Sequence, residues 1–339
     1  MPEKQEGYQK LRKQLKEGSF SQVYVFHGQE SFLLNHYLGL LQKALVPDGT
    51  EAFNLHKFDG RCVGYAALKE TVMDAPFMSD AKLILISDFD LYKLKDDEKS
   101  DWEGLLSDIP PGCYLVFIYN TLPYKPDKRT KWTQTIQKHL HTVEFALQDT
   151  ARLCDWVIRN FAKHDKLIDR TVSEYLIFRC GALMSSLENE IKKISAYAKA
   201  SCVTKNDINA VVVPILEAVA FDMTDAAAAG RIREAAEILQ KLQWMKNPPE
   251  MILGALSKTM RGVYAACLAR RYGKSARDVM EACGYRNIYP AEKLMKAAGG
   301  KSLKWCRNAL RVCRMADARL KGGSRDREGV IEWVLASLV

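Results

Sequence analysis

The sequence has no long apolar run and no paired cysteines. No stretch approaches the roughly 20 continuous apolar residues of a membrane helix, and residues 1–7 have no apolar core of a signal peptide. The nine cysteines form no Cys-x-x-Cys pair, which argues against a disulfide framework or a zinc ribbon. We therefore expect a cytoplasmic protein without membrane contact, in which most cysteines are small buried hydrophobic residues.

Motifs of common enzyme classes are also missing. The sequence contains no Gly-x-Ser-x-Gly, His-x-x-x-His or His-Glu-x-x-His. A phosphate loop would follow the apolar segment Val23–Phe26, but that turn has one glycine, Gly28, no Gly-Lys-Ser/Thr, and the carboxylate of Glu30. Asp88 follows an apolar run as a magnesium-binding acid would, yet Phe89 stands where a glutamate would orient water. These absences predict a nucleotide-binding fold that has lost its site, with no catalytic residue, metal or cofactor.

Positive charge is concentrated in the C-terminal third of the chain. The 339 residues suggest two or three domains, and their net charge is +9. Residues 251–330 hold 18 Lys and Arg against 6 Asp and Glu, a balance of +12 that leaves −3 for the rest. A basic C-terminal third fits a polyanion or an acidic partner. It fits equally well a helical domain whose solvated faces are rich in lysine and arginine.

The first 146 residues alternate strand-like and helix-like segments. Strands are expected at Val23–Phe26, 53–58, Lys82–Ser87, Cys113–Tyr119 and 143–145. Helices are expected from Ser31 and over 66–73, 99–107 and 131–140. His139 and His141 flank the last helix and strand, where we expect them to face solvent. The alternation predicts an α/β fold with a mostly parallel sheet and helices on both faces.

Only helical patterns remain after about residue 149. Residues 150–213 have the pattern of a small bundle, in which Thr204 caps a helix with Asp207 at its third position. Residues 215–339 are helical throughout, with a break at Asn247–Pro249. Arg307, Arg311 and Arg314 are spaced four and three residues apart and therefore share one helical face. Three nearby apolar residues could offer contact area, namely Trp305, Leu310 and Trp333.

The segment Thr71–Asp88 carries the strongest functional signal. A helix-like run ends near Pro76, whose ring disfavours helical geometry at the preceding residue. Phe77 and Met78 follow at a turn, where polar residues are the norm. One interpretation is that both side chains fold back onto the core. The other is an exposed apolar wedge for a pocket on a partner, since exposed apolar groups mark interaction sites.

Taken in order, these segments resemble the delta subunit family of the bacterial DNA polymerase III clamp loader. Val23–Glu30 is similar to the family's first strand and degenerate phosphate loop, and Met73–Ile86 to its clamp-binding element and following strand. Gly181–Lys193 is similar to a helix of the family's second domain, and Ala220–Ala227 to the start of its collar. The matching order extends over about 300 residues, which is far more specific than any single motif.

The resemblance implies an AAA+-like module followed by an all-α collar. Residues 1–148 would be a degenerate AAA+-like α/β domain with the clamp-binding element, 149–214 a small helical lid, and 215–339 a helical collar for oligomerisation. Such a subunit binds and opens the sliding clamp (beta subunit) for loading onto primed DNA. It works with the gamma/tau and delta prime subunits in the DNA polymerase III holoenzyme and has no ATPase activity or cofactor of its own. Pro76 and Phe77 align with the apolar pair that enters the clamp, with Met78 beside them, although Pro76 departs from the leucine often found there.

Two other functions are compatible with parts of the sequence. An active AAA+ ATPase with an unusual loop would explain the α/β pattern, but the missing lysine argues against it. A helical DNA-binding adaptor would explain the basic C-terminal third, whose face at Arg307, Arg311 and Arg314 could meet phosphates or acidic residues of other subunits. Salt-dependent DNA binding without clamp binding would favour the adaptor.

Overall fold

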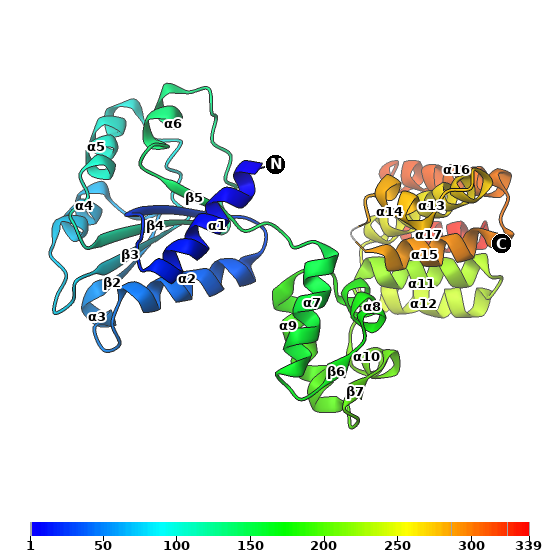
Figure 1. Cartoon of the computed structure of the whole chain (residues 1–339). Helices are drawn as coiled ribbons and strands as arrows, with labels where there is room; N and C mark the ends of the chain where they lie inside the picture. Colours follow the sequence, from blue (N-terminus) through cyan, green and yellow to red (C-terminus); the bar gives the residue numbers. More distant parts are fainter. Residues whose placement is uncertain (1, 286, 324, 339) are drawn as a thin grey trace. The chain divides into compact units, whose positions relative to one another are not determined.

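The computed structural model describes residues 2–285, 287–323 and 325–338 (Figure 1). The chain forms two compact units, Met1–Leu147 and Gln148–Val339, and each is described by itself. Within the described ranges no helix is long and apolar enough to cross a membrane. The same residues contain no group of three or more His, Cys, Asp or Glu side chains that could hold a metal ion.

The first unit is a five-stranded parallel sheet with helices on both faces. The strand order is β2-β3-β4-β1-β5. The strands are β1 Val23–His27, β2 Leu55–Asp59, β3 Lys82–Ser87, β4 Cys113–Tyr119 and β5 His141–Glu144. The helices are α1 Pro2–Glu17, α2 Ser31–Leu45, α3 Glu51–Asn54, α4 Tyr65–Met73, α5 Asp96–Ser107 and α6 Lys131–Ile136. The expected α/β class is confirmed.

Side-chain alternation along the central strands explains the three layers. Val23 and Val25 of β1 face the cluster that α4, α5 and α6 cover, whereas Tyr24 and Phe26 face the cluster under α1 and α2. Successive side chains of a strand point to opposite faces, so a strand buried on both sides must be apolar at every position. Figure 1 shows α1 and α2 together on one face of this sheet.

Three local expectations for this unit are corrected. Residues 53 and 54 belong to the short helix α3, and the strand begins only at Leu55. The helix expected over 131–140 ends at Ile136, and the last strand is His141–Glu144 rather than 143–145. Two of these differences concern residues discussed below, since Phe53 lies on a helical turn and His141 lies in the sheet.

The N-terminal helix α1 packs along the edge strand β5. The helix crosses the strand at Gly7, where an added Cβ would lie 2.2 Å from the Thr142 carbonyl oxygen. His141 is buried there, not solvent-facing as expected, and its Nε2 donates to the Gly7 carbonyl oxygen at 3.0 Å. Burial lowers the pKa of the His141 imidazole, and the charge of Lys10 adds to that effect.

The second unit is almost entirely helical. Its first part holds α7 Thr150–Ala162, α8 Arg170–Cys180, α9 Met184–Tyr197 and α10 Lys205–Val211. A two-stranded parallel pair, β6 Leu167–Ile168 and β7 Cys202–Val203, was not expected from the sequence. Thr204 caps α10 as predicted, because it accepts from the Asp207 N–H while the Asp207 carboxylate accepts from the Thr204 N–H.

The remaining helices share two apolar cores. They are α11 Leu216–Ala228, α12 Ile232–Trp244, α13 Pro249–Arg271, α14 Ala276–Cys283, α15 Ile288–Ala297, the 3-10 turn η1 Ala298–Gly300, α16 Leu303–Lys321 and α17 Arg327–Ala336. The long helix α13 contributes to both cores. Trp305, Leu310 and Trp333 pack against one of these cores, so much of the contact area expected of them is used inside the unit.

Candidate functional site

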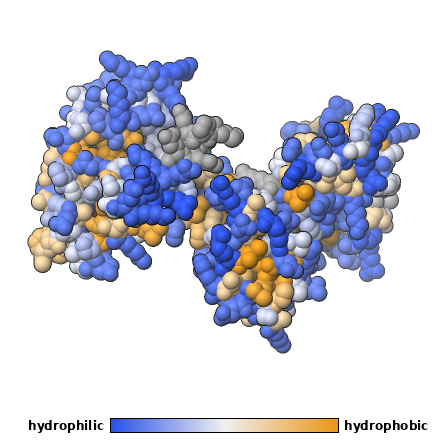
Figure 2. All heavy atoms as spheres, in the orientation of Figure 1, coloured by the Kyte–Doolittle hydropathy of each residue, from blue (hydrophilic) through white to orange (hydrophobic). Residues whose placement is uncertain are grey.

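The loop between α4 and β3, residues 74–81, presents apolar side chains to solvent. Helix α4 ends at Met73, and its C-cap residue Asp74 is extended. The helix thus stops before Ala75, the residue that the Pro76 ring keeps out of helical geometry. Phe77 is 52% exposed and Met78 is 84% exposed. Figure 2 shows apolar side chains gathered at the edge of the first unit where Figure 1 draws this loop. The structure therefore favours the exposed interpretation of this tip over the one in which it folds back.

A buried asparagine holds the backbone of the tip. The Asn54 Nδ2 donates to the Phe77 carbonyl oxygen at 2.8 Å, and the Phe77 N–H donates to Asn54 Oδ1 at 2.8 Å. Asn54 is fully buried at the end of α3. One amide side chain thus satisfies both backbone groups of Phe77, as a neighbouring strand would. The phenyl ring stays exposed although its own backbone is fixed.

Lys82 fixes the start of the same loop. Its side chain is buried, and its Nζ donates to the carbonyl oxygens of Thr71 and Asp74 at the C-terminal end of α4. Burial lowers the pKa of the Lys82 ammonium, while the nearby Cys113 and Asp74 act in the opposite direction. A cation at this end of the helix also meets the negative end of the helix dipole.

The far side of the loop rests on Gly112. That glycine has φ +80°, and an added Cβ would lie 2.5 Å from the Asp80 carbonyl oxygen and 3.6 Å from the Pro76 ring. A side chain at Gly112 would therefore push the loop outward. Pro76 is half-buried against this turn, whereas Phe77 and Met78 are exposed. Of the three predicted contact residues, the structure thus exposes two strongly and one in part.

The turn after β1 is tied to β5 rather than open to a phosphate. The Glu30 N–H donates to the Phe145 carbonyl oxygen at 3.0 Å, and a Cβ on Gly28 would lie 2.2 Å from that same oxygen. The Glu30 side chain is buried and accepts from the Phe32 N–H at the start of α2. In a phosphate loop the backbone amides must point at the ligand. Here a backbone amide and a carboxylate are used to join β1, α2 and β5.

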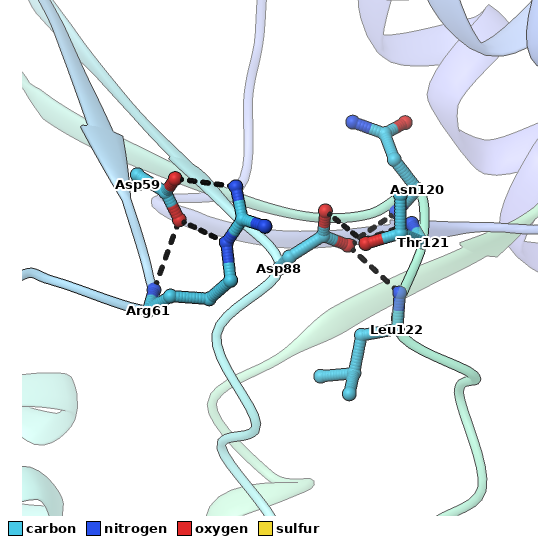
Figure 3. Close-up of polar contacts among 6 residues, drawn as sticks. All are labelled: Asp59, Arg61, Asp88, Asn120, Thr121 and Leu122. Atoms are coloured by element: carbon cyan, nitrogen blue, oxygen red, sulfur yellow. Dashed lines mark hydrogen bonds and ion pairs between the residues drawn. The ribbon is translucent and has the colours of Figure 1, made fainter.

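Asp88 holds another loop at the carboxyl edge of the sheet (Figure 3). Its Oδ1 accepts from the N–H groups of Asn120, Thr121 and Leu122 at 2.8, 2.9 and 3.0 Å, and its Oδ2 accepts from the Thr121 hydroxyl at 2.8 Å. Burial opposes ionisation, but these donors outweigh it and lower the pKa of Asp88. The Asp88 carboxylate, which resembled a magnesium ligand in sequence, thus accepts hydrogen bonds from the loop after β4.

The loop after β4 also covers the carboxyl end of β1. The Tyr124 ring stacks on His27 with centroids 4.0 Å apart, and the Tyr124 hydroxyl is 3.0 Å from that of Tyr92. At the end of the edge strand β2, which pairs with β3, Asp59 is bound by the guanidinium of Arg61 at 2.6 and 2.9 Å (Figure 3). Ligands of open α/β sheets bind at the carboxyl ends of the strands. Here protein side chains occupy that edge.

Comparison with known proteins gives the family. The family model described as DNA polymerase III, delta subunit, matches residues 24–146, and the model of the C-terminal domain of the same subunit matches residues 217–338. The chain belongs to the DNA polymerase III delta subunit family. The first match contains the exposed loop and the closed sheet edge, and the second contains the helices from α11 to α17.

Individual relatives agree with this assignment. The chain is 23% identical to the DNA polymerase III subunit delta of Bacillus subtilis strain 168, covering 96% of this chain and 95% of the relative. It also resembles the solved structure of the Bacillus subtilis DNA clamp loader delta protein, at 21% identity and a TM-score of 0.52, over 97% of this chain and 98% of that one. As a delta subunit it is a component of the DNA polymerase III clamp loader, the function expected from the sequence.

The predicted basic face of this delta subunit lies on α16. Arg307, Arg311 and Arg314 are all exposed, and Arg311 donates to the Asn308 side chain at 2.9 Å. In the described part of the chain, Arg307 and Arg314 form no ion pair. Other basic residues nearby are engaged, since Arg319 lies 4.1 Å from the centre of the Trp333 ring and Lys321 pairs with Asp317. The three predicted arginines are therefore accessible, whereas Arg319 and Lys321 are engaged within the unit.

Sequence reasoning found the tip of the loop but missed the residues that support it. Asn54 lies 23 residues before Phe77 and fell within an expected strand, so no local pattern connected the two. Lys82 opens a strand that is apolar from Leu83 to Ile86, and a lysine at such a position could have signalled a buried cation with specific partners. Gly112 lies in the Pro110–Gly112 turn before β4, and no local sequence pattern indicated that it would support the loop.

Proposed function

We propose that this delta subunit binds the sliding clamp through Pro76, Phe77 and Met78 and opens it for loading onto primed DNA. The observation that carries the proposal is an apolar tip that is exposed while its backbone is held by buried Asn54. Exposed aromatic and methionine side chains on a fixed backbone suit insertion into an apolar pocket, because little backbone conformational entropy is lost on binding. Phe77 is the principal anchor, and half-buried Pro76 contributes mainly by shaping the turn.

We further propose that the subunit neither binds nor hydrolyses ATP. Three features support this: the Glu30 amide bonded to Phe145, the Asp88 carboxylate bonded to residues 120–122, and the Tyr124 ring over His27. The free energy for loading would then come from the gamma/tau subunits. No cofactor or metal is needed for the proposed role.

The helical unit would connect the subunit to the rest of the loader. We assign residues 149–214 to a lid and 215–339 to a collar that joins gamma/tau and delta prime in the cytoplasm. The exposed face at Arg307, Arg311 and Arg314 would meet either phosphates of the primed DNA or acidic residues of a neighbouring subunit. Salt-dependent DNA binding by the isolated chain without affinity for the clamp would instead identify a DNA-binding adaptor.

Replacement of Phe77 by alanine tests the central proposal. An aromatic anchor desolvated in a pocket typically contributes about 2–4 kcal/mol, so clamp affinity should fall by about 30-fold or more. Tyr272→Ala is the control, because Tyr272 is 70% exposed but lies in the second unit. Clamp affinity measured by calorimetry should be unchanged in the control. Equal affinities for wild type and a folded Phe77→Ala variant would refute clamp binding through this loop.

A further inference from the structure

We infer that Phe53 is a second aromatic contact of the clamp-binding surface, beside Phe77. This inference rests on the proposed function of the loop. Phe53 lies on α3 and is 58% exposed, and its ring centroid is 4.8 Å from that of Phe77 at an interplanar angle of 45°. Two phenyl rings from segments more than twenty residues apart therefore meet at the surface, where each remains half accessible to a partner.

Phe53 and Asn54 are neighbours on the short helix α3, but their side chains point in opposite directions. Asn54 points inward, is fully buried and binds the backbone of Phe77, whereas Phe53 points outward. Because Asn54 draws the Phe77 backbone against α3, the two rings are brought side by side. The pairing is thus imposed by backbone hydrogen bonds and does not depend on apolar collapse of the rings alone.

The surface around the pair suits one wide apolar pocket. Met78 and Met73 are 84% and 45% exposed, and their flexible thioethers can adapt to a partner. Asp74 and Asp80 are exposed on the two sides of the tip. A matching pocket on the clamp would accommodate two rings side by side and would have a neutral or basic rim. Two aromatic anchors that exclude water from each other form a typical hot spot.

Alanine substitution at position 53 measures the contribution of this ring. Phe53→Ala in the full chain should weaken clamp binding by about 5- to 30-fold, while Phe53→Leu keeps an apolar side chain and should lose much less. Tyr197→Ala is the matched control, because Tyr197 is an aromatic residue 55% exposed in the second unit. Since each ring covers the other, the Phe53→Ala/Phe77→Ala pair should lose less affinity than the product of the single losses.

Photo-crosslinking distinguishes direct contact of Phe53 with the clamp from an indirect role of Phe53 in supporting Phe77. A benzophenone amino acid in place of Phe53 should crosslink to the clamp under ultraviolet light, and one in place of Tyr197 should not. Unchanged affinity of Phe53→Ala, or absence of the crosslink, would overturn the inference while Phe77→Ala could still show weakened binding. If Phe77→Ala binds as wild type does, the proposed function itself fails, so the two failures are distinguishable.

Discussion

Replacing Asn54 by alanine should weaken clamp binding without removing any contacting side chain. The substitution deletes two hydrogen bonds of 2.8 Å, one donated to and one accepted from the Phe77 backbone. A net contribution of about 0.5–1.5 kcal/mol per hydrogen bond gives a loss of about 1–3 kcal/mol in the preference for the held loop. A free-energy loss of about 1–3 kcal/mol corresponds to a loss of clamp affinity of about 5- to 150-fold. These values are upper limits. Because Lys82 and Gly112 still restrain the loop, we expect a value nearer the lower end.

A matched asparagine in the other unit serves as the control. Asn287 is also buried, donates from Nδ2 to the Glu174 carbonyl oxygen at 2.7 Å and accepts from the Tyr289 N–H at 2.8 Å. Asn287→Ala therefore removes bonds of the same kind far along the chain from the loop. Calorimetric titration of each full-length variant with the clamp should show a loss for Asn54→Ala and none for Asn287→Ala.

The combination with Phe77→Ala tests the mechanism. If Asn54 acts only by holding Phe77, then adding Asn54→Ala to Phe77→Ala should reduce affinity little further. Wild-type affinity of a folded Asn54→Ala variant would refute the idea that the loop must be held in advance. An equal loss in Asn287→Ala would show that the effect is one of general stability.

Further predictions concern other parts of the chain. Calorimetric titration with Mg-ATP should give no binding heat, and magnesium-dependent binding would show that the sheet edge can open. The stability conferred by neutral His141 is present above its ordinary pKa of 6.5 and is lost as the pH falls, because the unfolded chain takes up the proton first. Urea midpoints at about pH 5 and pH 8 should therefore differ more in wild type than in His141→Gln. Gly112→Ala should destabilise the loop by about 1–2 kcal/mol because of its positive φ, and a clamp affinity equal to that of wild type would contradict the role of Gly112 in supporting the loop. Replacement of Arg307, Arg311 and Arg314 by serine should weaken loader assembly or shift the salt dependence of DNA binding. A triple variant identical to wild type in both assays would show that this face is only solvated.

The elements that the sequence predicted well are those determined by their own residues. Strands β3 and β4 have the expected bounds, since a run of buried branched and aromatic side chains has few alternatives in a parallel sheet. Helix α4 stops at Met73, near the end expected from Pro76, whose ring disfavours helical geometry at Ala75. The exposed tip could be proposed for the same reason, because apolar residues at a turn are conspicuous in sequence.

The parts that sequence did not predict depend on partners far along the chain. Helix α1 is mostly polar and charged, and its Leu11 is buried only because the helix packs against the sheet. His141 was expected at the surface because nothing near it reveals that Gly7 would accept its hydrogen bond. Asn54 and Lys82 were missed for the same reason, since each acts on a backbone group of another element.

The crossing of α1 over β5 at Gly7 has a consequence for the behaviour of shortened chains. The sheet has two edges, and β5 is one of them. An edge strand left open offers unpaired backbone groups to strands of other molecules. By packing along β5, α1 covers a surface on which two copies could otherwise join edge to edge. Proteolysis that removes α1 should therefore favour self-association through β5, even where the clamp-binding tip is untouched.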